Sequence, residues 1–131
     1  MTEELGIQSS VNVKLIQKFI SNMTGADEVF IFSRGDGASD DLISFEYENW
    51  KYSPDKPHPV VNCFNDRAFI EVRDLRNNLV INKDKNLIKY IDRTKGVLWL
   101  NMLGDNVILA YFSDEKSISG FNQKFFKNIS N

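Results

Sequence analysis

Two apolar runs joined by a short turn dominate the second half of the chain and limit its possible folds. "VLWLNML" covers residues 97–103, "VILAYF" covers residues 107–112, and Gly104-Asp105-Asn106 separates them. Glycine followed by aspartate between two such runs is a signal for a β-hairpin. Strands with one solvent-exposed face are polar at every second position, whereas strands buried on both faces are apolar throughout. The two runs therefore predict inner strands of a sheet that is covered on both sides.

The remaining hydrophobic patterns give the order of the other elements. We expect helices over residues 11–23, 65–77, 83–96 and 114–129, and further strands over 28–34, 42–52 and 79–82. The segment "SPDKPHP", 53–59, holds all three prolines and predicts a surface loop. This order predicts an α+β fold, a central antiparallel sheet of about five or six strands with helices on both faces in three layers. The expected core-facing residues of the first helix are Val11, Leu15, Ile16, Phe19, Ile20 and Met23.

Length and charge restrict the class of protein. A chain of 131 residues is expected to form a single domain over 1–131. Its net charge of −2 argues against nucleic acid as a partner. The first twenty residues do not show a signal peptide, and no apolar run reaches the length of a membrane span. We therefore expect a cytoplasmic protein with neither a nucleic-acid nor a membrane partner.

Two long segments resemble the GAF family of small sensory domains. "CFNDRAFIEVRDLRNNLVINKDKN", 63–86, is similar to the family's helix and short strand, and "GVLWLNMLGDNVILAYFSDEKSISGFNQKFF", 96–126, is similar to its final strand, turn, strand and helix. The resemblance implies a GAF-like domain, within the broader group of GAF, PAS and profilin-like three-layer folds. Roadblock, profilin-like and type III secretion chaperone domains can also end in strand, strand, helix, so they remain alternatives.

The resemblance also implies where a ligand and a second copy would bind. GAF ligands lie between the sheet and the middle helices. The tentative pocket residues are Phe45, Cys63, Phe64, Phe69, Asn82, Tyr90 and Trp99. Dimerisation through the outer faces of the terminal helices implies an interface at Phe121, Phe125 and Phe126.

Other candidate residues have a structural and a functional interpretation. Cys63 is expected to be a small buried side chain rather than a reactive thiolate, although an enzymatic role for this thiol is kept as a hypothesis. His58 is expected to be a solvated loop residue. The basic stretch of Lys83, Lys85 and Lys89, with Arg93 and Lys95 beyond it, is interpreted first as a solvated helix face and second as a contact for an anionic ligand or partner. We expect no catalytic residue, cofactor or metal.

The function expected from these observations is a noncatalytic sensory or regulatory GAF-like domain. Such a domain would bind a small ligand or a protein partner, signal through its terminal helices and form a homodimer. The alternative is a dimeric protein-interaction module of the profilin-like or type III secretion chaperone type.

Overall fold

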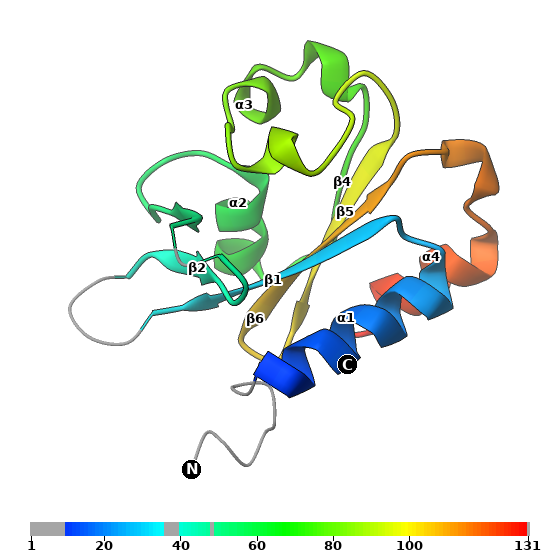
Figure 1. Ribbon diagram of the computed structural model, residues 1–131, viewed down its shortest axis with the longest axis horizontal. Helices are drawn as coiled ribbons and strands as arrows, with labels where there is room; N and C mark the ends of the chain where they lie inside the picture. Colours follow the sequence, from blue (N-terminus) through cyan, green and yellow to red (C-terminus); the bar gives the residue numbers. More distant parts are fainter. Residues whose placement is uncertain (1–9, 36–39, 48, 131) are drawn as a thin grey trace.

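The protein is an α+β structure built on one antiparallel sheet of six strands (Figure 1). The order of strands across the sheet is β3-β2-β1-β6-β5-β4. The strands are β1 (Glu28–Arg34), β2 (Leu42–Ser44), β3 (Lys51–Tyr52), β4 (Ile70–Val72), β5 (Val97–Leu103) and β6 (Asn106–Phe112). The computed structural model describes residues 10–35, 40–47 and 49–130, and the helices within them are α1 (Ser10–Thr24), α2 (Pro59–Asp66), α3 (Leu79–Asn82) and α4 (Gly120–Lys127). The predicted fold class is confirmed.

The hairpin of β5 and β6 lies inside the sheet and is buried on both faces, as predicted. β6 pairs with β1 on one side and β5 on the other, and β5 pairs in turn with β4. Successive residues of β5 enter different apolar clusters, Leu98 and Leu100 on one face of the sheet and Val97 and Trp99 on the other. The turn residue Gly104 has a φ of +63°, the left-handed conformation that glycine adopts most readily at such turns.

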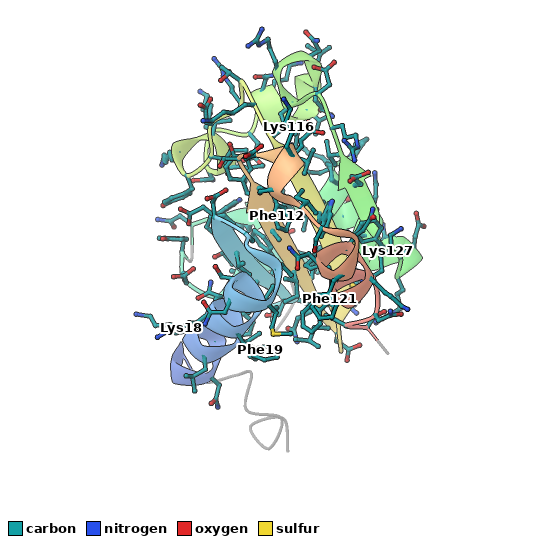
Figure 2. All side chains as sticks on the ribbon, turned by 90° about the vertical axis from the view of Figure 1, so that its right-hand side faces the viewer. Lys18, Phe19, Phe112, Lys116, Phe121 and Lys127 are labelled. Atoms are coloured by element: carbon teal, nitrogen blue, oxygen red, sulfur yellow. The ribbon has the colours of Figure 1, made fainter. Side chains whose placement is uncertain are left out.

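Helices α1 and α4 form the layer over one face of the sheet, where Figure 2 shows them side by side. The side-chain amide of Asn122 donates to the backbone carbonyl of Thr24 over 2.8 Å and joins the two helices. Val13, Ile20 and Phe126 point into this core and are almost completely buried.

The buried side of α1 differs from the predicted stripe. Leu15 and Phe19 are 60% and 56% exposed, while Val13 and Thr24 are buried. The buried face of the helix is therefore rotated about the helix axis by about 100°, one residue position, relative to the prediction. The side chain of Val11 lies outside the described part of the structure.

Helices α2 and α3 lie on the opposite face of the sheet. α2 packs against β4, β5 and β6. Trp50 lies in this core with its ring centroid 4.9 Å from that of Phe30 and 5.0 Å from that of Phe32. The Tyr90 ring stacks on the same indole at 5.6 Å.

The predicted helix over 65–77 is wrong, because the helix in this region begins earlier. α2 starts at Pro59, where proline is favoured because the first helical N–H needs no partner within the helix. It ends before Arg67, whose φ of +49° is left-handed. The apolar residues that follow form β4, which pairs with β5 at the edge of the sheet.

Other predicted boundaries also differ. The predicted strand at 79–82 is the single helical turn α3, because the Asn78 side chain accepts from the Ile81 N–H and caps it. The predicted helix over 83–96 is reduced to a 3₁₀ turn at Leu87–Lys89. The predicted strand over 42–52 is divided into β2 and β3. The last helix begins at Gly120 with Ser119 as its N-cap, after a 3₁₀ turn at Glu115–Ser117.

Candidate functional site

A hollow lies on the α2/α3 side of the sheet, between two segments far apart in the sequence. It has a volume of about 710 Å³, within the range of small-molecule sites. One wall is β3 with the chain that leads into α2, and the other is α3 with the residues after it. We call it the lysine cleft. Its lining is Asp41, Lys51, Tyr52, Ser53, Lys56, Pro57, His58, Val80, Lys83, Asp84, Lys85 and Asn86.

Four exposed lysines give the cleft its charge. Lys51 and Lys56 belong to the first wall, and Lys83 and Lys85 to the second. Two carboxylates, Asp41 and Asp84, are also present, so positive charge is in excess. A concavity lined by an excess of basic groups raises the local concentration of anions. The cleft is therefore suited to a small ligand that carries more than one negative charge.

A buried chain of hydrogen bonds forms one side of the cleft. The indole N–H of Trp50 donates to the Tyr52 hydroxyl over 2.7 Å, and that hydroxyl donates to Asp84 Oδ2 over 2.5 Å. His58 Nε2 lies 2.9 Å from the same oxygen. His58 Nδ1 accepts from the backbone N–H of Val60 over 3.1 Å, so the ring proton is placed on Nε2, which donates to Asp84. The network fixes the two walls to each other.

The network also sets the charges of its members. Burial by itself would raise the pKa of Asp84, but hydrogen bonds from His58, Tyr52 and the Leu87 amide outweigh burial and lower that pKa. Burial, followed by the negative charge of Asp84, raises the pKa of Tyr52 well above its usual range. At neutral pH Asp84 is an anion and Tyr52 a neutral donor.

His58 was predicted to be a solvated loop residue, and the structure shows that this is wrong. Its side chain is only 8% exposed and caps the N-terminus of α2. Pro59 carried part of the signal for this role, since proline is favoured at the first position of a helix.

The basic stretch 83–95 is divided by the fold. Lys83 and Lys85 line the lysine cleft, and Lys95 lines a different hollow. Lys89 and Arg93 line neither hollow. The sequence analysis did not identify Lys51 and Lys56 as residues of the same site, because they lie in a different segment of the chain from Lys83 and Lys85.

The seven residues of the tentative pocket do not come together. Phe45, Phe69 and Trp99 pack on the α1/α4 side of the sheet. Cys63, Phe64 and Tyr90 pack on the opposite side, in the other core. The Asn82 side chain donates to the backbone carbonyls of Leu75, Arg76 and Asn78. None of the seven lines the lysine cleft.

Cys63 is a residue of α2 and is fully buried in the core between that helix and the sheet. Burial, with a smaller effect of the nearby Asp66 carboxylate, raises the pKa of the Cys63 thiol to about 12. The thiol is therefore protonated at neutral pH and lacks the thiolate character of a nucleophile.

The three residues of the tentative dimer interface differ in accessibility. Phe121 is 66% exposed and Phe125 is half-buried, with its ring centroid 6.0 Å from that of Phe19. Phe126 is fully buried, against Trp99 and Phe69, and is not available to a second copy.

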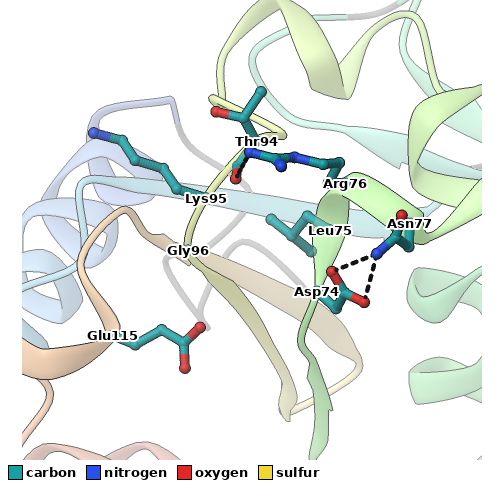
Figure 3. A pocket seen from close by; sticks show the side chains of 8 residues that line it. All are labelled: Asp74, Leu75, Arg76, Asn77, Thr94, Lys95, Gly96 and Glu115. Carbon is teal, nitrogen blue, oxygen red and sulfur yellow. Dashed lines mark hydrogen bonds between the residues drawn. The ribbon is translucent and has the colours of Figure 1, made fainter.

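A smaller hollow of about 320 Å³ lies between the 3₁₀ turn at Leu75–Asn77 and the start of β5 (Figure 3). The Asp74 carboxylate accepts from the Asn77 amide over 2.9 and 3.0 Å, and the Arg76 guanidinium donates to the Thr94 carbonyl over 3.4 Å. Acidic and basic side chains are balanced around it, since Glu115 and Lys95 complete the set. This hollow therefore selects no ligand by charge.

Within residues 10–35, 40–47 and 49–130, the side chains of His, Cys, Asp and Glu form no group of three or more that could hold a metal ion. None of the helices in these ranges has the length and apolar character needed to cross a membrane. No protein-family model matches the chain, and no curated protein matches its sequence.

Proposed function

We propose that this protein is a noncatalytic sensory or regulatory domain of GAF-like type whose lysine cleft binds a small anion. The observation that carries the proposal is that four lysines from two distant segments, Lys51, Lys56, Lys83 and Lys85, line one hollow. The hollow lies on the side of the sheet that α2 and α3 cover, the side of the middle helices in the GAF resemblance, although its lining differs from the pocket residues that the resemblance implied. The chemistry of the lining suits phosphate or carboxylate groups.

The state of the buried groups supports a binding role rather than a catalytic one. Both ring nitrogens of His58 are engaged within the protein, by the Val60 amide and by Asp84. The imidazole would have to break one of these bonds to accept a proton from a substrate. The Cys63 thiol is buried and protonated, so the hypothesis of an enzyme based on it loses its support.

A connection from the cleft to the terminal helices runs through the sheet. Lys51 and Tyr52 form β3 at the edge, β3 pairs with β2, β2 pairs with β1, and α1 packs on β1. A ligand that contacts both walls of the cleft would favour one position of β3, the edge strand of the sheet, over others. We infer that binding changes the packing of α1 by such a population shift.

Calorimetric titration with inorganic pyrophosphate tests the proposal. We expect saturable binding to the full chain, and binding weaker by about tenfold or more in a Lys83→Ala/Lys85→Ala variant, because charge-assisted contacts are lost. Lys89→Ala is the matched control, since Lys89 is an exposed lysine of the same segment outside the cleft. Absence of binding, or equal weakening by the control, would refute the proposal.

A second candidate is a protein-interaction module of the profilin-like or type III secretion chaperone type. Its support is the exposure of Leu15, Phe19 and Phe121 on the terminal helices. The homodimer form of this candidate uses Phe121 and Phe125 at the interface. Sedimentation equilibrium of the purified chain tests it: a dimer is expected, whereas only the 15.1 kDa monomer at micromolar concentration would eliminate the homodimer.

A further inference from the structure

The exposed side of α1 and α4 carries an apolar strip that continues from one helix to the other. Leu15 and Phe19 of α1 are more than half exposed, and so is Phe121 of α4. The half-buried Phe125 connects them, since its ring meets that of Phe19 edge to face at 6.0 Å. Large exposed apolar side chains that are contiguous commonly mark an interaction surface.

Lysines border this strip on both sides. With 100° between successive residues of a helix, Leu15 and Phe19 lie toward α4, and Lys14 and Lys18 lie on the far side of α1. The same geometry places Phe125 of α4 toward α1 and Lys124 on its far side. Figure 2 shows this order, with Lys18 and Lys127 at opposite borders and Phe19 and Phe121 between them.

The charge of this surface is opposite in sign to that of the chain. α1 and α4 contain four lysines and no aspartate or glutamate, whereas the whole chain has a net charge of −2. Lys14, Lys18, Lys124 and Lys127 are all exposed. A partner that covers the strip therefore meets the positive charge of these four lysines along its borders.

The two helices run in opposite directions. Asn122, near the start of α4, reaches Thr24 at the end of α1, and Phe125, one turn later, reaches Phe19. An antiparallel helix pair with an apolar strip between polar borders accepts a third helix by the packing used in helical bundles.

We propose that this surface docks an acidic amphipathic helix of a partner protein. The apolar stripe of that helix covers Leu15, Phe19 and Phe121, and glutamates or aspartates on both sides of the stripe pair with Lys18 and Lys124. A second copy of this chain fits less well, because it brings its own lysine-bordered strip against this one. The interaction is separate from the lysine cleft, which lies on the opposite side of the sheet.

Three synthetic helical peptides as long as α1 test the proposal. They share one leucine and phenylalanine stripe, and the positions beside the stripe are glutamate, glutamine or lysine. Fluorescence anisotropy with the full chain should show binding of the glutamate peptide that is stronger than that of the lysine peptide by about tenfold or more. Raising the salt concentration should reduce the difference, since exposed charges are screened.

A charge-reversed variant, Lys18→Glu/Lys124→Glu, is the decisive comparison. It should lose the preference for the glutamate peptide, because the strip is then bordered by two glutamates and two lysines. Lys83→Glu, in the lysine cleft on the opposite side of the sheet, should keep the wild-type preference. We expect each variant to fold, because the substituted lysines are all exposed. Thermal unfolding of each variant checks this. Equal binding of the three peptides to the wild type, or an unchanged preference for the glutamate peptide in the folded variant, would overturn the proposal. Binding only to vesicles with phosphatidylserine, or dimerisation that excludes the glutamate peptide, would also overturn it.

Discussion

His58 and Asp84 lie 26 positions apart in the sequence, yet they are joined by a hydrogen bond of 2.9 Å between His58 Nε2 and Asp84 Oδ2. The side chains are 8% and 7% exposed. His58 precedes α2 and Asp84 follows α3, so this pair holds together the two walls of the lysine cleft. The shape of the cleft therefore depends on a polar contact inside the protein.

Replacement of Asp84 tests the weight of this contact. Asp84→Asn keeps the size of the side chain but removes the charge that accepts from both Tyr52 and His58. We expect the free energy of unfolding to fall by about 1–3 kcal/mol, the usual cost of a buried polar group that loses its partner. Urea denaturation measures it, with Asp105→Asn as the control because Asp105 is 89% exposed. Equal losses in the two variants would contradict the structural role of Asp84.

The same carboxylate makes a contribution to stability that depends on pH. Because the pKa of Asp84 is lower in the folded protein than in the unfolded chain, the unfolded chain binds more protons as the solution is acidified. The stabilising contribution of ionised Asp84 is complete above about pH 4, the pKa of aspartate in an unfolded chain. It is lost as the pH falls through the lower pKa that Asp84 has in the folded protein. The difference in unfolding free energy between wild type and Asp84→Asn should therefore narrow below about pH 4. A difference that stays constant on acidification would show that the charge is not responsible.

Gly96 marks a close approach between the start of β5 and the end of β6. Its φ is +93°, and a Cβ at this position would lie 2.2 Å from the carbonyl oxygen of Phe112. We expect Gly96→Ala to lower the free energy of unfolding by about 1–3 kcal/mol through backbone strain. Gly120→Ala is the matched control, since nothing lies within 4 Å of its added Cβ and its φ is not positive. The control should be neutral or slightly stabilising, and the opposite ranking in chemical denaturation would be incompatible with this geometry.

Phe121 and Phe126 belong to the same helix, α4, but the first is exposed and the second is buried. Phe126 is fully buried against Trp99 and Phe69, so Phe126→Ala should cost about 3–5 kcal/mol of unfolding free energy. Phe121→Ala, at a position that is 66% exposed, should change it by only about 0.5 kcal/mol. Thermal and urea unfolding compare the pair, and a large loss at Phe121 would show that this side chain is covered.

The sheet centre could be predicted because its signal is local. The runs at 97–103 and 107–112 are apolar at almost every position and are separated by a turn that contains glycine, and β1 has the β-branched and aromatic composition of a strand. Burial on both faces follows from such a composition without knowledge of the partners.

The middle of the chain could not be predicted in the same way. Its apolar runs are short, and residues 79–82 fit a strand or a helical turn equally well. The choice depends on tertiary contacts and caps, such as Asn78 at α3 and His58 at α2. The placement of Phe69 and Trp99 on one face and Phe64 and Tyr90 on the other likewise depends on the register of strands.

The lysine cleft was even less accessible from the sequence. Lys51 and Lys56 are separated from Lys83 and Lys85 by the whole of α2, β4 and α3, and only the fold brings the two pairs together. Exposed lysines on a single segment are common, so neither pair predicts a site by itself.

A chemical-shift titration of the isotopically labelled full chain with inorganic pyrophosphate tests the lysine cleft most directly. We predict saturable shifts at the backbone amides of the non-proline residues in 51–58 and of 80–86, on both walls at once, with smaller shifts in β1 and α1. Unchanged spectra, or shifts confined to residues outside these two walls, would contradict it.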